Sequence, residues 1–142
     1  MAEASTGKVN FELVTPTELV FSEDTNMVVL PGAEGDFGVL PGHTPFLTTL
    51  RAGLIDIHQG GAIAWSLFVE GGFAEATPGR CTVLATSVRS MDDVAPEDAK
   101  ERLNAAEEAL RGADDENRVG LEAERVAAEA MVKAIEMRAA AG

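Results

Sequence analysis

Three side chains able to take part in acid–base chemistry or ionic recognition stand close together in one stretch, Pro31–Pro45. Two are the carboxylates Glu34 and Asp36, and the third is one of only two histidines in the chain, His43. Paired carboxylates act as general acid and base in enzymes, whereas at a surface the same groups bind a charged partner. The surrounding structure decides between these two interpretations.

Glycine and proline recur through Pro31–Pro45, which predicts a loop and not a strand or a helix. The stretch also carries apolar residues that a solvated linker would lack, so we expect Phe37 and Leu40 to pin it while its polar groups point outward. On such a loop we expect Glu34 and Asp36 to face solvent or a partner protein. The DFG sequence at 36–38 stands without the other protein kinase motifs and is a chance match.

The remaining candidates for chemistry are isolated. A zinc site needs three or four clustered ligands, and His43, His58 and Cys81 fall on separate predicted segments. We expect Cys81 to be an inert, buried thiol. Trp65 and Phe68 suit core packing better than an aromatic ligand platform. The sequence therefore predicts no catalytic, cofactor-binding or metal-binding residue, and a protein that is not itself an enzyme.

Composition narrows the possible partners. The 142 residues include 24 acidic and 11 basic side chains, giving a formal net charge of −13. This balance argues against binding to nucleic acid and against adsorption on anionic lipid. The N-terminus lacks a signal peptide's apolar region, and no window reaches the roughly 18 apolar residues of a membrane span. We expect a soluble, cytoplasmic protein without direct membrane insertion.

Short apolar stretches separated by turn signals predict β-strands across residues 8–90, after a loose tail over residues 1–7. Gly60-Gly61 predicts a tight hairpin, and Thr77–Arg80 predicts a type II turn. This pattern is typical of a β-sandwich or a flattened barrel. The expected strands are Val9–Leu13, Leu19–Phe21, Asn26–Leu30, Leu47–Leu50, Leu54–Ile57, Ile63–Val69, Phe73–Ala76 and Cys81–Ala85.

From about residue 91 the composition changes to alanine and glutamate. Pro96 suits a first helical position, Gly112 ends the helix, and Asp114–Asn117 offers caps for a second helix to about Ala140. The short connection predicts an antiparallel hairpin. We expect two domains, 1–90 and 91–142, of which the first folds alone. The expected seam is Ala99, Leu103, Ala106 and Leu110 against Leu121, Ala128, Val132 and Ile135, with Val126 and Met131 alongside.

Three segments together resemble a known family. The loop PGAEGDFGVLPGHTP, followed by VEGGFAEA and TVLATS, closely resembles the ε subunit of bacterial F-type ATP synthase, called δ in mitochondria. The resemblance implies a mainly β protein with an α appendage, a ten-stranded β-sandwich followed by a C-terminal antiparallel helix-loop-helix. It also implies a non-catalytic central-stalk subunit that couples rotation between the γ subunit and the c-ring during proton-driven ATP synthesis.

The same resemblance assigns partners and a location. It places Glu34, Asp36 and His43 on the loop that contacts the c-ring. It implies that the C-terminal helices inhibit ATP hydrolysis and reach the α and β subunits. The protein would then lie at the cytoplasmic face of the bacterial inner membrane, as a peripheral part of the complex, and bind no cofactor.

Some members of the family bind ATP between the two C-terminal helices, through a motif near the start of the first. The matching segment here is Pro96–Glu101, in which Lys100 replaces the motif's arginine and Glu101 its small alanine. A lysine lacks the bidentate fork suited to phosphate, and the glutamate repels it. Arg118 and Arg125 remain in the second helix, beside acidic neighbours. We therefore expect no ATP binding.

Two other classes of function stay open from the residues alone. One is a free-standing sandwich that binds a small ligand or carbohydrate and dimerises through its helices; a ligand-filled pocket in a stable homodimer would favour it. The other is an enzyme. Co-purification with a membrane-bound rotary complex would favour the stalk subunit over both.

Overall fold

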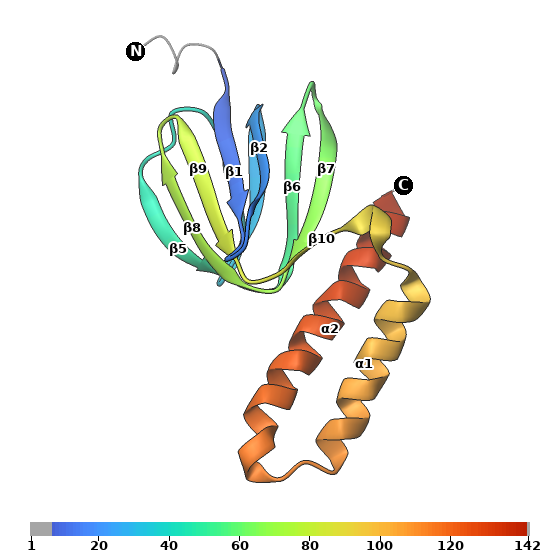
Figure 1. Ribbon diagram of the computed structural model, residues 1–142. Helices are drawn as coiled ribbons and strands as arrows, with labels where there is room; N and C mark the ends of the chain where they lie inside the picture. The colour runs from blue at the N-terminus through green and yellow to red at the C-terminus, as the bar shows by residue number, and fades with distance from the viewer. Residues whose placement is uncertain (1–6, 142) are drawn as a thin grey trace. The chain divides into compact units, whose positions relative to one another are not determined.

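The computed structural model describes residues 7–141, so most of the expected N-terminal tail lies outside the described residues. The chain forms two compact units, with the division between Ser90 and Met91 (Figure 1). The first unit consists of strands and the second of helices.

The β unit is one continuous ten-stranded sheet. Its strand order is β10-β7-β6-β3-β5-β8-β9-β1-β2, with β4 paired to β3 alone. Every described pairing is antiparallel except that of β1 with β9. The strands are β1 (Val9–Val14), β2 (Leu19–Thr25), β3 (Met27–Gly32), β4 (Gly35–Val39), β5 (Phe46–Leu50), β6 (Gly53–Gln59), β7 (Ala62–Val69), β8 (Gly72–Thr77), β9 (Arg80–Ala85) and β10 (Val88–Ser90).

The sheet curls into two layers because β3 and β5 share a single residue pair, Gly32 with Leu50. One layer holds β5, β8, β9, β1 and β2, and the other holds β10, β7, β6, β3 and β4 (Figure 1). The predicted ten-stranded β-sandwich is therefore confirmed. It arises from a curled sheet whose two inner faces enclose the core.

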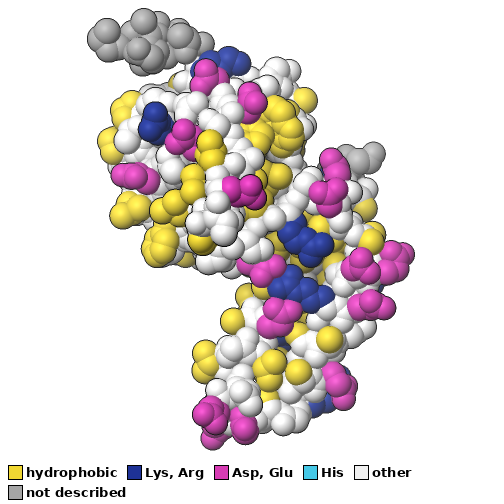
Figure 2. All heavy atoms as spheres, in the orientation of Figure 1, with side chains coloured by type: hydrophobic (Ala, Val, Ile, Leu, Met, Phe, Trp, Pro, Cys, Tyr) yellow, Lys and Arg dark blue, Asp and Glu magenta, His cyan; other side chains and the backbone are white. Residues whose placement is uncertain are grey.

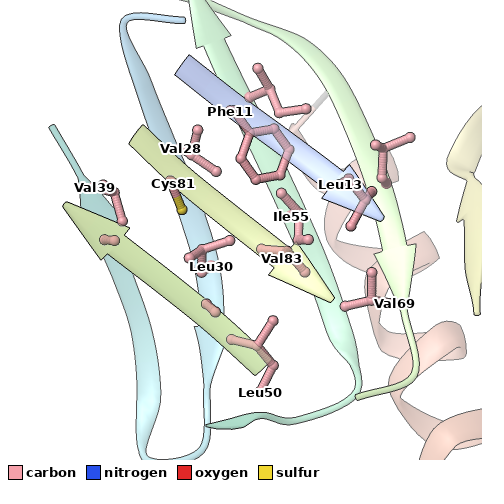
Figure 3. Packing of buried hydrophobic residues seen from close by; sticks show 14 of the residues in the cluster. Phe11, Leu13, Val28, Leu30, Val39, Leu50, Ile55, Val69, Cys81 and Val83 are labelled. Carbon is pink, nitrogen blue, oxygen red and sulfur yellow. The ribbon is translucent and has the colours of Figure 1, made fainter. Parts of the chain in front are cut away.

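Alternating apolar residues fill the space between the layers, as the period-2 pattern predicts. On β1 the residues Val9, Phe11 and Leu13 are fully buried. Figure 3 shows Phe11 and Leu13 together with core residues of the other strands, among them Ile55 and Cys81. Burial raises the pKa of the Cys81 thiol to about 12, so this side chain remains an uncharged core residue at neutral pH.

Most strands differ from the expected bounds by one or two residues, and the β2 and β10 regions differ more. The second strand was expected to end at Phe21, but β2 continues to Thr25, where the hydroxyl donates to the Val9 carbonyl oxygen at 3.0 Å. The three-residue strand Val88–Ser90 was not expected, because it is too short and too polar to show a pattern. The Gly60-Gly61 hairpin is confirmed, with both glycines at positive φ.

The turn between β8 and β9 is not the expected type II turn. That type needs a positive φ at Gly79, and Gly79 is not among the described glycines with positive φ. The carbonyl of Pro78, which belongs to the central peptide of the turn, accepts a hydrogen bond from the Gly42 amide at 2.7 Å. This contact fixes the orientation of the central peptide and ties the turn to the loop after β4.

The second unit begins with a short 3-10 helix, Met91–Asp93, followed by α1 (Pro96–Arg111) and α2 (Asp115–Ala141). Pro96 opens α1, and the Asp114 carboxylate accepts from the Asn117 amide at 3.0 Å, so both predicted starts are confirmed. No helix among the described residues is both long and apolar enough to cross a membrane.

The seam of this hairpin is built mainly from small side chains. The expected Ala99, Ala106, Ala128 and Met131 are buried, as are Ala127 and Ala134. The other expected seam residues are half-buried: Leu103, Leu110, Leu121, Val132 and Ile135. Val126 was expected beside the seam but lies on the outer side of α2, where it is exposed. The reason is helical periodicity, since the neighbouring Ala127 and Ala128 occupy the inward positions.

Candidate partner-binding surfaces

The Pro31–Pro45 stretch is a β-hairpin in its first half, so the prediction of a loop without strands was wrong. Pro31 and Gly32 complete β3, and Gly35–Val39 forms β4. Val39 is fully buried and Phe37 packs against the core, so β4 alternates like an ordinary strand despite its glycines. Those glycines are tolerated because β4 pairs only with β3 and lies at the edge.

Two glycines shape the turn of this hairpin. A Cβ on Gly32 would lie 2.7 Å from the Gly35 carbonyl oxygen and 2.8 Å from the Phe37 ring, so no side chain fits there. Gly35 has a φ of 144°, which other residues rarely adopt. Between them Ala33 and Glu34 form the exposed tip. The sequence therefore places the Glu34 carboxylate at the outermost point of the hairpin.

Asp36 is held by an arginine that the sequence analysis did not single out. The Arg51 guanidinium donates from Nη2 to Asp36 Oδ1 at 2.6 Å and from Nη1 to the Gly32 carbonyl oxygen at 2.5 Å. The Arg51 amide also donates to the Pro31 carbonyl oxygen at 2.9 Å. Asp36 is therefore a structural part of the hairpin as well as a surface carboxylate.

Glu34 has no hydrogen-bond or ion-pair partner among the described residues. Its side chain borders an open hollow of about 450 Å³ between the hairpin and β5. Thr48 and Thr49 of β5 line the opposite side of this hollow. The hollow is polar and open to solvent, which suits contact with another protein better than enclosure of a reacting substrate.

His43 anchors the loop that follows β4. Its Nδ1 lies 2.6 Å from the Thr44 carbonyl oxygen, and its amide donates to the Leu40 carbonyl oxygen at 3.1 Å. The ring stacks edge-to-face on Phe46, with centroids 5.0 Å apart, and Phe46 contacts Phe37 in the same manner at 5.2 Å. Leu40 was expected to pin this loop, but it is 54% exposed, and the aromatic contacts take that role.

The three predicted site residues therefore form two groups. Glu34 and Asp36 belong to the tip of the hairpin, whereas His43 follows the far end of β4, which spans five residues. They do not form a catalytic cluster. Among the described residues there is also no group of three or more His, Cys, Asp or Glu side chains able to hold a metal ion.

A second surface, which sequence reasoning missed, crosses the outer face of the β5-β8-β9-β1-β2 layer. The strand register aligns Phe73 with Leu84, Leu84 with Val14, and Val14 with Leu19. Phe73, Leu84 and Leu19 are each more than half exposed. We call these four residues the apolar row. The neighbouring row carries Glu12 and Glu75, in keeping with the mixture of apolar and acidic side chains on the β unit in Figure 2.

Trp65 and Phe68 do not form a shared aromatic platform. They lie three positions apart on β7, so their side chains point to opposite faces of the sheet. Phe68 is fully buried, and Trp65 rests edge-to-face on Phe21 with centroids 5.0 Å apart.

Arg102 and Arg125 of the hairpin are engaged by acids, whereas Arg118 donates to the Ala113 carbonyl oxygen at 3.1 Å. Arg102 of α1 donates from Nε and Nη2 to the Glu124 carboxylate of α2 at 2.7 and 2.9 Å. The hydrogen bond from Arg102 lowers the pKa of Glu124. Arg125 donates to Glu122 at 2.6 Å and to Glu129 at 3.0 Å. Figure 2 likewise shows basic side chains of the hairpin flanked by acidic ones. This arrangement offers little free positive charge to a polyphosphate.

Comparison with known proteins identifies the family. The family model described as ATP synthase, Delta/Epsilon chain, beta-sandwich domain matches residues 8–90. The ATP synthase epsilon chain of Paramagnetospirillum magneticum is 46% identical over 129 residues, covering 90% of this chain and 97% of the relative. That of Rhodospirillum rubrum is 47% identical over 106 residues, covering 75% and 79%.

A solved structure shares the fold. In the Euglena gracilis mitochondrial ATP synthase (OSCP/F1/c-ring), one chain matches with a TM-score of 0.83 at 20% identity, covering 91% of this chain and 82% of that chain. At this identity the match shows the fold alone, whereas the sequence relatives and the family model show common descent. The chain belongs to the family of ATP synthase epsilon chains, which are non-catalytic subunits of that enzyme.

Proposed function

We propose that this chain works in the central stalk of ATP synthase, where its β unit couples rotation of the γ subunit to the c-ring during proton-driven ATP synthesis. The observation that carries the proposal is the pair of exposed surfaces on one rigid sandwich. One surface is apolar and the other acidic, as a coupling element between two different partners requires.

The apolar row fits the γ subunit. A row of apolar side chains across four strands, three of them more than half exposed, is unusual on a protein that works alone, and it marks a protein interface. Leu84 lies inside this row and Phe73 at its β8 end, each with more than half of its side chain exposed. Burial of such side chains supplies most of the affinity at an interface, which suits a partner that rotates with the subunit.

The hairpin tip and the His43 loop fit the c-ring. Exposed carboxylates pair with basic or polar groups on a partner loop, and such pairs fix orientation more than they add affinity. Glu34 is the outermost carboxylate of the tip, and His43 is fixed by its contacts with Thr44 and Phe46. This assignment keeps Glu34, Asp36 and His43 as contact residues, but on two adjoining elements.

We assign a regulatory role to the helical hairpin. Its thin, alanine-rich seam suits a segment that changes partners, so we infer that it inhibits ATP hydrolysis by contacting the α and β subunits. In this arrangement the subunit lies at the cytoplasmic face of the inner membrane and is attached there only through the complex.

The γ contact is tested with Leu84→Glu and Phe73→Glu. Each variant is expected to bind F1 depleted of this subunit at least about tenfold more weakly, as for the central residues of an interface. Ile63→Glu is the matched control, since Ile63 is similarly exposed on β7 and lies outside the row. If all three variants bind equally well, the apolar row is not the γ contact.

The c-ring contact is tested by reversing the charge of the tip. Glu34→Lys combined with Asp36→Lys is expected to reduce ATP-driven proton pumping in inverted vesicles while the isolated subunit stays folded. Glu23→Lys on β2 controls for net charge. Normal assembly and pumping by the double variant would exclude the tip as a contact.

A further inference from the structure

A second set of apolar side chains runs along α2, on the side turned away from α1. Val119, Val126 and Met137 are 80%, 48% and 65% exposed. Ala128, which is buried in the seam, follows Val119 by nine residues, and nine residues make about two and a half turns of an α-helix. The outer set and the seam therefore lie on opposite sides of α2, and pairing with α1 leaves the outer set uncovered.

The spacing of this outer set is that of a coiled-coil seam. Its members follow one another at alternating intervals of four and three residues, and we call them the outer stripe: Val119, Ala123, Val126, Ala130, Lys133 and Met137. Such alternation keeps one face of a helix against a partner helix. Lys133 is the single charged member, and one polar residue at such a position fixes the register of a coiled coil. The outer stripe therefore fits a helix as its occupant.

One border of the outer stripe is acidic. Glu122, Glu129 and Glu136 recur every seven residues, and we call these three residues the acidic column. Arg125 donates to Glu122 and Glu129, whereas Glu136 has no hydrogen-bond or ion-pair partner among the described residues. In a coiled coil, residues at the border of the seam pair with opposite charges on the partner helix. The acidic column therefore matches lysine or arginine side chains on the docking helix.

The same charges disfavour two other occupants. A second copy of this chain would add another acidic protein of net charge −13 to the contact. An anionic bilayer surface attracts helices whose polar residues are basic, and it repels a column of glutamates. A basic helix of a different protein meets neither obstacle.

We propose that the outer face of α2 docks an amphipathic helix of a partner protein, with apolar residues against the outer stripe and basic residues against the acidic column. The hairpin stays closed in this contact, because the stripe is exposed while the seam is intact. Arg125 restrains the contact, since it competes with the incoming cations for Glu122 and Glu129. The proposal goes beyond the stalk function and does not depend on the contacts of the β unit.

The test measures binding of the full-length subunit to a designed peptide of roughly 28 residues, long enough to form a helix, with leucine at both seam positions of each heptad and lysine at both border positions. A matched peptide carries glutamate in place of lysine. In fluorescence anisotropy the lysine peptide is expected to bind saturably and the glutamate peptide at least about tenfold more weakly. Equal binding of the two peptides, or no saturable binding of the lysine peptide, would overturn the proposal.

Substitutions on α2 test the stripe and the column separately. Val126→Gln is expected to weaken binding of the lysine peptide about tenfold by removing a buried apolar contact, although glutamine favours a helix more than valine does. Glu136→Lys is expected to weaken it about fivefold. The controls are Ala105→Gln and Glu107→Lys at exposed positions of α1, with changes below about twofold expected. If the α2 variants bind like these controls, the outer face of α2 is not the docking surface.

Arginine variants test the state of the hairpin. Arg125→Gln releases two glutamates of the column and is expected to tighten binding about threefold at low salt. Arg111→Gln removes the same charge from a pair with Glu108 on α1, so it is the control, and equal effects of the two would contradict the role of Arg125. Arg102→Ala loosens the seam and is expected to leave binding unchanged. Tighter binding by Arg102→Ala would mean that α2 binds as a released helix, which contradicts docking to the closed hairpin.

Two measurements without the peptide test the other occupants. Sedimentation is expected to show a monomeric subunit, and flotation with phosphatidylglycerol vesicles is expected to show no bound fraction. A dimer or a vesicle-bound fraction that disappears in Val126→Gln would assign the outer face to a second copy or to lipid, and would overturn the proposal.

Cross-linking tests whether the assembled complex uses this face. Val119→Cys labelled with a photoactivatable maleimide is expected to give a product with a helical segment of another subunit that carries lysine or arginine beside its apolar stripe. Ala105→Cys on α1 is the control, and no such product is expected from it. No product from Val119→Cys, or a product with a segment that lacks basic residues, would overturn the proposal while leaving the proposed contacts of the β unit intact.

Discussion

The interior of the β unit is made of large apolar side chains, whereas the seam of the helical hairpin is made mostly of alanines. Phe11, Leu13 and Ile55 are fully buried between the layers, and each contributes about 1.5–3 kcal/mol by burial. In the seam Ala99 and Ala106 bury far less area, and Met131 is the largest fully buried side chain.

Ion pairs in the helical hairpin add stability that its small apolar side chains do not supply. The bidentate pair of Arg102 and Glu124 joins its two helices, and Arg125 bridges two glutamates along α2. Ion pairs respond to pH, salt and competing partners, while a packed apolar core does not. The difference explains how one chain can contain both a rigid platform for rotation and a segment suited to regulation.

The largest expected effect comes from the core of the β unit. Phe11→Ala is expected to lower the free energy of unfolding by about 3–5 kcal/mol, because it leaves a cavity among fully buried neighbours. Ala106→Gly in the hairpin should cost about 1 kcal/mol through helix propensity.

Urea unfolding distinguishes the two units, since Trp65 fluorescence reports the β unit and circular dichroism at 222 nm reports the helices. Phe11→Ala is expected to move the fluorescence midpoint much further than the helical one. Equal shifts in both signals would mean that the units unfold as one.

A smaller effect is expected from the ion pair between the helices. The hydrogen bond from Arg102 lowers the pKa of Glu124 in the folded state. The pair therefore stabilises the hairpin at pH values above the ordinary pKa of a carboxyl group. This contribution is lost as the pH falls through the lowered pKa of Glu124. Arg102→Ala should therefore cost about 1 kcal/mol or less at pH 7, given the partial exposure of Glu124.

The cost should shrink toward zero below about pH 4, where carboxylates become protonated. Arg111→Ala, which removes a pair with Glu108 inside α1, serves as the control and should cost less. Thermal unfolding followed at 222 nm measures both variants. A cost for Arg102→Ala that grows at low pH would contradict the assigned role.

Removal of the helical hairpin is expected to change the stability of the β unit less than either substitution above. Truncation after Ser90 is expected to give a domain that unfolds cooperatively, with a Trp65 unfolding midpoint close to that of the full chain, because its core cluster consists of residues from its own strands. Chemical denaturation of the two proteins makes the comparison. An aggregated or molten product would show that the helices complete the core.

We expect the subunit not to bind Mg-ATP. Arg102 and Arg125 are engaged by glutamates, and Glu101 stands where the family's nucleotide motif has a small residue. Calorimetric titration of the subunit with Mg-ATP should show no saturable binding. Saturable binding in the micromolar range would contradict this prediction and would mean that the helical hairpin senses ATP.

Local sequence pattern predicted most of the fold because the physical causes are local. The alternation of Val9, Phe11 and Leu13, the glycine pair at 60–61, Pro96 at the start of α1 and the Asp114 cap of α2 each act within a few residues. β4 escaped prediction because its glycines resemble a loop. Only pairing with β3, and the space that Gly32 leaves for Phe37, make it a strand.

The candidate surfaces were harder to predict because they depend on register. Arg51 lies 15 residues after Asp36, and nothing in the sequence joins them until the hairpin packs beside β5. Phe73, Leu84 and Leu19 each resemble ordinary strand residues. They become a surface only when four strands align them on one outer face.

Cross-linking in the assembled complex tests whether one sandwich contacts two different partners. Glu34→Cys and Leu84→Cys are made separately and labelled with a photoactivatable maleimide; the parent chain is the background control, since Cys81 is fully buried. We expect Glu34→Cys to give a product with the c subunit and Leu84→Cys to give a product with γ. Exchange of the two products, or no product from either position in an assembled complex, would contradict it.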